Sequence, residues 1–288
     1  MPNPILSKEF TIGKLYFINE YETRGLIYEI FYQNAYMQHN LILKPGAVIV
    51  DVGANIGLFS LFALKQCEYD AVIYSFEPIP ATFECLKMNL ASFQNQTHLY
   101  NLGIGDVVKD CSIEFTLFGS DLATATYKPL DKLISNYNLL LDYNALLAVS
   151  RFRSKFLYYQ LKMLPFLRKH LIERYYKKRT EQKKTLCKLT SLGLFIEKNR
   201  INHIDFIKID VEGAEFEVVK SIKPTQFPFI QQLCIEVHDI DNRVKNLTAY
   251  LKEQGYLVQV DRNQIFKKVG GNQHMIYAKR ASLHNGHY

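Results

Sequence analysis

The chain has 288 residues, of which 48% are hydrophobic, and this is long enough to bury a sizeable core, so a very small binding module is excluded. Its first residues lack the charged and apolar regions of a signal peptide, and no stretch approaches the roughly 18 apolar residues of a spanning helix. We therefore expect a cytoplasmic protein without a transmembrane segment. The five cysteines are scattered and form no Cys-x-x-Cys pair, which predicts reduced thiols and no zinc site.

The net charge of +7 is concentrated in residues 151–184, where twelve Lys or Arg stand against two Glu. Three interpretations of this aromatic, basic segment are open: a helical cap with solvated lysines, a surface that attracts an acidic carrier protein, or a helix on an anionic membrane surface. An electrostatic arm for RNA is a further alternative. Because the charge is confined to one segment and no N/D-P-P-Y/F-type motif is present, we expect no nucleic-acid partner.

The expected elements, in chain order, begin with a helical lid in residues 1–45. Nearly continuous apolar runs then predict strands at 46–51, 71–78, 97–106, 203–210 and 231–239. Helical spacing predicts helices directly after the first, second, fourth and fifth of these strands. Residues 256–260 and 274–280 predict a β-hairpin at the sheet edge. This alternation indicates a Rossmann-like α/β fold, with a mainly parallel seven-stranded sheet covered on both faces.

The predicted domain organisation is a Rossmann-like core with an insertion. The core comprises residues 46–119 and 186–280, and residues 120–185 form a helical basic and aromatic cap inserted over the site. Residues 281–288 are expected to be a tail. Ligands in such sheets bind at the carboxyl ends of the strands, so functional residues are sought at Asp51, Glu77, Asn101, Asp210 and His238.

The turn after the first strand, D-V-G-A-N-I-G at 51–57, supplies glycines where the backbone turns sharply. Dinucleotide cofactors need G-x-G-x-x-G, whereas this turn has Asn55 in the middle and Ser60 in place of the third glycine. S-adenosylmethionine carries no phosphate, so the looser turn suffices for it, and Asp51 can help to hold its amino-acid portion. Glu77, 24 residues beyond Gly53, can accept both ribose hydroxyls.

Four motifs occur in a characteristic order: DVGANIG (51–57), FEP (76–78), NLGIGD (101–106) and KIDVEGAE (208–215). Together they resemble the FkbM-type methyltransferase family. The resemblance implies the class I methyltransferase fold, S-adenosylmethionine as cofactor, and O-methylation of sugars, polyketides or related metabolites. It also implies a set of cofactor-binding residues, with Asn101 near the adenine: Asp51, Gly53, Ala54, Asn55, Gly57, Glu77, Pro78, Asn101 and Asp210.

The sequence departs from the family pattern on the substrate side. Leu189-Thr190-Ser191 stands where family members commonly carry an acidic pair, and the insertion at 120–190 is longer than in a minimal member. Both departures affect the expected binding of the methyl acceptor more than that of the cofactor.

His238, at the end of the fifth strand, has an ordinary pKa near 6.5 that suits a general base for a hydroxyl. Glu236, Glu212 and Asp210 are candidates to orient its imidazole, while Glu215 either caps its helix or joins the site. A divalent metal held by Asp210, Glu212 and Asp239 is an alternative that nothing in their spacing demands, so we expect no metal.

We therefore expect an S-adenosylmethionine-dependent O-methyltransferase. Its acceptor is a small molecule, free or tethered to an acyl or peptidyl carrier protein, in polyketide or peptide biosynthesis. Methylation of a sugar or glycan hydroxyl is the main alternative, followed by RNA methylation.

Overall fold

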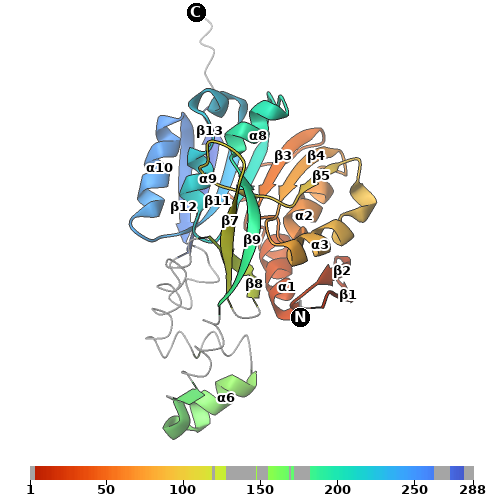
Figure 1. The fold of residues 1–288 in the computed structure, drawn as a ribbon, viewed down its shortest axis with the longest axis vertical. Coiled ribbons are helices and arrows are strands. Elements are labelled where there is room, and N and C mark those ends of the chain that lie inside the picture. The colour runs from red at the N-terminus through yellow and green to blue at the C-terminus, as the bar shows by residue number, and fades with distance from the viewer. Residues whose placement is uncertain are drawn as a thin grey trace, which may run out of the picture.

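The computed structural model describes residues 4–118, 121–127, 147, 155–168, 170–171, 182–262 and 273–281. Its central element is a seven-stranded sheet in the order β12-β13-β11-β10-β3-β4-β5 (Figure 1). The strands are β3 (Ala47–Val52), β4 (Ala71–Phe76), β5 (Thr97–Tyr100), β10 (Phe206–Ile209), β11 (Gln232–His238), β12 (Tyr256–Arg262) and β13 (Gln273–Arg280).

All neighbouring strands from β5 to β11 run parallel, whereas β13 is antiparallel to both β11 and β12. The expected Rossmann-like fold is confirmed, and the arrangement is that of class I methyltransferases. The predicted hairpin forms, with β13 inserted between β12 and β11. β3 is rich in β-branched residues and nearly all of it is buried, as expected for a strand covered on both faces.

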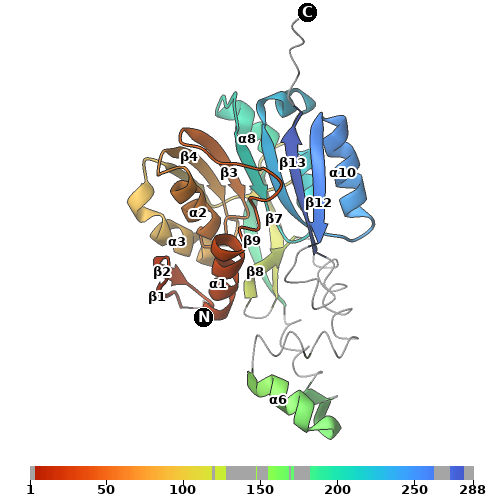
Figure 2. The same cartoon turned by 180° about the vertical axis from the view of Figure 1, so that it is seen from behind.

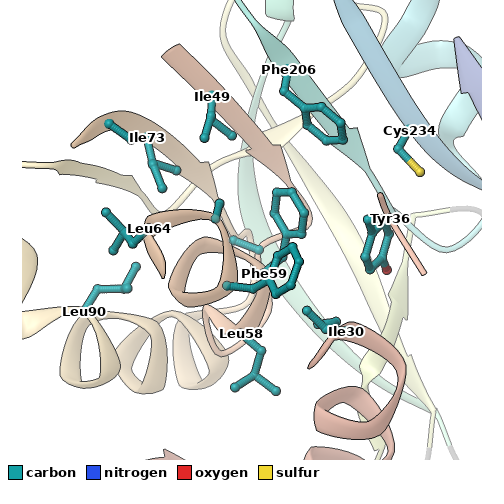
Figure 3. Close-up of a cluster of buried hydrophobic side chains, with 14 of the residues drawn as sticks. Ile30, Tyr36, Ile49, Leu58, Phe59, Leu64, Ile73, Leu90, Phe206 and Cys234 are labelled. Atoms are coloured by element: carbon teal, nitrogen blue, oxygen red, sulfur yellow. The ribbon is translucent and has the colours of Figure 1, made fainter. Parts of the chain in front are cut away.

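Two helical layers cover the sheet (Figures 1 and 2). On one face lie α1 (Glu20–Ile27), α2 (Leu58–Gln66) and α3 (Pro80–Asn89). On the other lie α8 (Leu192–Lys198), α9 (Glu215–Lys220) and α10 (Arg243–Glu253). Alternation along β3 divides the core accordingly, because Ile49 belongs to the first layer and Val50 to the second. Figure 3 shows the first layer, where Phe59 of α2 packs between Tyr36 and Phe206.

A second sheet, not expected from the sequence, lies beside the first in the order β6-β9-β7-β8. It consists of β6 (Gly103–Ile104), β7 (Cys111–Phe118), β8 (Asp121–Thr126) and β9 (Gln182–Thr190). The expectation of a wholly helical insertion is therefore wrong at both ends, because β8 and the start of β9 pair with β7. β9 has an alternating pattern of exposed lysines and buried residues, which fits a strand with one solvated face.

Within the insertion, the described elements are α6 (Lys155–Met163) and the 3₁₀ turn η3 (Pro165–Leu167). α6 lies away from the seven-stranded sheet in both views (Figures 1 and 2). Most of the predicted cap, and much of the basic segment 151–184, lies outside the described residues. The tail at 281–288 does so apart from its first residue.

The N-terminal segment is only partly helical, in contrast to the expected helical lid. It begins with a hairpin of β1 (Leu6–Phe10) and β2 (Gly13–Phe17), and α1 then continues into the π-helix η1 (Tyr28–Tyr32). Two further 3₁₀ turns are η2 (Ala91–Phe93) and η4 (Pro224–Phe229). The five cysteines, all in described segments, are free thiols. Among the described helices, none has the length and apolar character needed to span a bilayer.

Candidate functional site

The glycine turn that follows β3 is tied to the ends of two neighbouring strands. Gly53 has φ +77°, and a Cβ there would lie 1.8 Å from the backbone oxygen of Asp210, so only glycine fits. The N–H groups of Gly53 and Ala54 both donate to the Phe76 carbonyl at the end of β4, at 3.0 and 2.9 Å. Asn55 is also left-handed, with φ 51°. The turn thus has one fixed shape before any ligand binds.

Glu77 extends from the end of β4 towards this turn. Its Oε2 accepts from the Asn55 N–H and its Oε1 from the Ile79 N–H, both at 2.9 Å. Burial raises the pKa of Glu77 to about 7, against the opposing effect of these hydrogen bonds. Asn101 donates to the backbone oxygens of Glu77 and Pro78 at 2.9 and 3.0 Å, so its amide fixes the loop that carries the carboxyl group.

Asp51 and Lys208 form a buried pair behind the turn. Asp51 is fully buried, and its Oδ2 accepts from the Ser60 hydroxyl at 2.7 Å while its Oδ1 lies 3.3 Å from Lys208 Nζ. Ser60 also contacts the Ser75 hydroxyl at 2.9 Å. Lys208 Nζ donates to the Gly53 carbonyl at 2.6 Å. These contacts hold the glycine turn in place from inside the sheet.

Asp210 connects the pair to the N-terminal segment. Its Oδ2 accepts from the Tyr36 hydroxyl at 3.1 Å and lies 3.6 Å from Lys208 Nζ. Burial alone would lower the pKa of Lys208, but the carboxylates of Asp51 and Asp210 raise it, so the ammonium stays charged. Lys208 also lies over the Tyr36 ring, 5.6 Å from its centroid.

A cavity runs along the carboxyl ends of the strands between these groups. Its walls come from the glycine turn, the ends of β4, β10 and β11, the N-terminal segment, and the second sheet. The lining side chains with polar groups are Glu29, Tyr36, Asn55, Glu77, Tyr127, Lys208, Asp210, Glu212, Glu236 and Gln273. Apolar groups, including Ile79 and Phe115, line the end beside the second sheet.

His238 lies behind the cavity wall and touches two carboxyl groups. Its Nδ1 is 3.3 Å from Glu215 Oε1, and its Nε2 is 3.2 Å from Glu212 Oε2 and 2.8 Å from Gln273 Nε2. Glu215 is fully buried and also accepts from the Gly213 N–H at 2.6 Å, and its Oε2 lies 3.3 Å from Arg243 Nη1. Glu215 therefore contacts the imidazole and also holds the backbone N–H of Gly213, just before its helix.

The structure brings most of the sequence-predicted residues to one cavity. Six of the cofactor candidates line it: Gly53, Ala54, Asn55, Glu77, Pro78 and Asp210. The other three, Asp51, Gly57 and Asn101, lie behind the lining and hold it in place. Of the catalytic candidates, Asp210, Glu212 and Glu236 line the cavity, while His238 reaches it through Glu212.

Sequence reasoning missed Glu29, Tyr36, Lys208 and Gln273. A lysine inside the buried strand F-I-K-I was a signal for Lys208, because an unpaired ammonium is rarely buried. Glu29 and Tyr36 gave no such signal. Of the three possible metal ligands, Asp239 accepts from the Val244 N–H at 3.1 Å, at the start of α10. Among the described residues, no group of three or more His, Cys, Asp or Glu side chains is placed to hold a metal ion.

The fold and the site define a class I methyltransferase: a seven-stranded sheet with one antiparallel strand, a glycine turn after β3, and a buried acid at the end of the neighbouring strand β4. The model of the Methyltransferase FkbM domain matches residues 51–258, and the chain belongs to this family of S-adenosylmethionine-dependent methyltransferases. The predicted resemblance is thus confirmed, and the family implies S-adenosylmethionine as methyl donor.

Two relatives of known name extend the comparison. The chain is 27% identical to 31-O-demethyl-FK506 methyltransferase FkbM of Streptomyces tacrolimicus, over 92% of this chain and 93% of the relative. It is also 27% identical to the AMB antimetabolite synthetase AmbE of Pseudomonas aeruginosa, over 91% of this chain but only 12% of the synthetase. The crystal structure of methyltransferase FkbM from Methylobacillus flagellatus KT is similar with a TM-score of 0.51 at 12% identity, covering 84% of this chain and 46% of that one.

Proposed function

We propose that the protein transfers a methyl group to a hydroxyl of a small or carrier-tethered acceptor. The observation that carries the proposal is the continuity of one cavity, which joins the glycine turn and Glu77 to the Glu212 carboxylate after β10. His238 of β11 contacts this carboxylate from behind the cavity wall. The name of the Streptomyces relative, a 31-O-demethyl-FK506 methyltransferase, supports an oxygen acceptor.

The cavity has the chemistry that S-adenosylmethionine requires. Glu77 has two carboxylate oxygens, each with a lone pair beyond its backbone hydrogen bond, and these can accept the ribose hydroxyls. Ile79 and Phe115 would supply an apolar wall for the adenine, and the turn at Gly53 together with Asp210 would hold the amino-acid portion. When bound, the cofactor supplies an electrophilic methyl group on its sulfonium.

We place the proton acceptor at the Glu212–His238 pair. Glu212 lines the cavity and takes the hydroxyl proton, and His238 behind it shares that proton through Nε2. Glu215 holds the other side of the ring, which fixes the direction of Nε2. Glu212 has φ 54°, so the backbone holds it in a left-handed conformation that turns this residue at the end of β10.

A carrier-tethered acceptor is supported by two features of the chain. The basic segment 151–184 carries an excess of positive charge, and one relative of the chain is a much larger synthetase. The described, exposed lysines of this segment include Lys162 and Lys183. Their replacement by Glu is expected to lower methyl transfer to a carrier-bound hydroxyl while sparing a free mimic, and equal loss on both acceptors would contradict docking.

The first experiment is a calorimetric titration with S-adenosylmethionine and S-adenosylhomocysteine. We expect micromolar binding that weakens at least tenfold in Glu77→Ala, since about 1.4 kcal/mol corresponds to tenfold in affinity. Glu253→Ala, at an exposed position at the end of α10, is the matched control and should bind as the parent does. A folded protein that binds neither molecule would refute the proposed function.

The acceptor class is tested next with labelled S-adenosylmethionine and a panel of alcohols, thiols and amines. Label recovered on oxygen, and lost in Glu212→Gln while S-adenosylhomocysteine binding is kept, is the expected result. Label found on nitrogen or carbon would refute the hydroxyl acceptor.

A further inference from the structure

The end of the cavity opposite the apolar wall is lined by four carboxyl groups: Glu29, Asp210, Glu212 and Glu236. Two of them have a cationic neighbour or a nearby imidazole. Asp210 lies 3.6 Å from the Lys208 ammonium, and Glu212 lies 3.2 Å from His238. Glu29 and Glu236 are the other two carboxyl groups at this end.

Glu236 is the unusual member of this group. It is only 7% exposed, and it faces the cavity from β11. Within the described part of the chain, no hydrogen-bond donor or basic side chain contacts its carboxyl group. Burial raises the pKa of Glu236 well above its ordinary value, and the carboxyls of Asp210 and Glu29 raise it further. A buried acid without a donor is costly to keep unless a ligand completes it.

Glu29 approaches from a different element. It belongs to η1, is 8% exposed and lines the same cavity. It is held there because the N-terminal segment is fixed to the core: the Tyr36 hydroxyl donates to Asp210 at 3.1 Å, and the Tyr277 hydroxyl donates to the Ala35 carbonyl at 2.7 Å. Two carboxyl groups from sequence-distant elements thus face one small space.

We propose that this end of the cavity binds a protonated amino group of the acceptor, with Glu236 as its principal partner and Glu29 across from it. This inference rests on the proposed function, and it narrows the acceptor to an amino alcohol, free or tethered. An ammonium donates three hydrogen bonds, and a donor is what the Glu236 carboxyl lacks among the described residues. Its positive charge would also offset the carboxyls of Asp210 and Glu29, which raise the pKa of Glu236.

The test uses the protein saturated with S-adenosylhomocysteine. The site for the cofactor's own ammonium is then filled, so the probes cannot bind there. The probes are linear amino alcohols of two to six carbons, each compared with its N-acetyl derivative and with the alcohol that lacks nitrogen. Dissociation constants are measured by ligand-observed NMR for the parent, Glu236→Gln, Glu29→Gln and the exposed control Glu253→Gln.

We expect the best amino alcohol to bind at least about tenfold more tightly than its N-acetyl partner, as a charged hydrogen bond provides. This ratio of affinities between the amino alcohol and its N-acetyl partner should fall below about twofold in Glu236→Gln. It should be smaller than in the parent for Glu29→Gln and unchanged for Glu253→Gln. S-adenosylhomocysteine should bind all four proteins alike. Amino alcohols that bind no better than their partners, or not at all, would overturn the proposal.

Two results separate this inference from the proposed function. Weaker S-adenosylhomocysteine binding in Glu236→Gln would assign the carboxyl to the cofactor and overturn the acceptor assignment alone. Failure of the parent protein to bind S-adenosylhomocysteine would refute the proposed function itself. Glu236→Gln replaces a buried acid with an isosteric amide, so its fold is checked by thermal melting before titration.

Discussion

Cofactor affinity should depend on pH through Glu77. Burial raises the pKa of this carboxyl to about 7, so near neutral pH the free protein is a mixture of protonated and ionised forms. Ribose hydroxyls donate hydrogen bonds and therefore favour the ionised form. Binding must then release a proton wherever Glu77 is protonated, and affinity should rise as the pH increases through this pKa.

The size of the effect follows from that pKa. With a value of about 7, about one tenth of the free protein has an ionised Glu77 at pH 6 and about nine tenths at pH 8. S-adenosylhomocysteine should bind about tenfold more weakly at pH 6 than at pH 8, which is about 1.4 kcal/mol. Near pH 7, roughly half a proton should be released per molecule bound.

The assay is calorimetry in buffers of different ionisation enthalpy, which gives the affinity and the number of protons released. Glu77→Gln cannot ionise, so its weaker binding should no longer change between pH 6 and 8, while the surface variant Glu253→Gln should behave as the parent. Equal affinity of the parent at both pH values, or proton release that persists in Glu77→Gln, would refute the assignment of the ribose to this carboxyl.

Two further substitutions test the contacts that hold the glycine turn. Gly53→Ala should abolish cofactor binding and lower the melting temperature, because its Cβ would lie 1.8 Å from a backbone oxygen, whereas Gly25→Ala in α1 meets nothing within 4 Å and should be tolerated. Lys208→Met should cost about 3–5 kcal/mol in urea unfolding because Asp51 loses its cation, while exposed Lys65→Met should change little. An unfolding midpoint of Lys208→Met equal to that of the parent would contradict the role of the pair.

Much of the core was predictable because its signals are local. Runs such as A-V-I-V-D-V alternate with helical patterns, and each strand ends at a polar or glycine residue. The glycine turn and Glu77 were recognisable for the same reason. The contacts that hold this turn come from other strands, because Gly53 lies against the Asp210 backbone and donates to the Phe76 carbonyl.

The second sheet was not predictable because its strands pair across the insertion. β7 pairs with β9, matching Cys111 with Leu189 and Phe118 with Gln182, and nothing near either strand reveals the partner. Because the sequence between them is basic and aromatic, a helical cap was predicted there instead of strands. The N-terminal hairpin was missed because each of its strands has only five residues and β1 is mostly exposed, so the apolar pattern is too short to identify a strand.

The sequence by itself determined the alternation of strands and helices in the core, the place of the glycine turn and the acid at the end of the next strand, because these depend on hydrophobic periodicity and local residue patterns. Only the tertiary structure decided which polar groups share the cavity. The Tyr36 hydroxyl and the Asp210 carboxyl are 174 positions apart, and Glu29 joins Glu236 from a separate helix. Such contacts arise when the N-terminal segment packs on the carboxyl ends of the strands, and their charges interact strongly because that packing removes water.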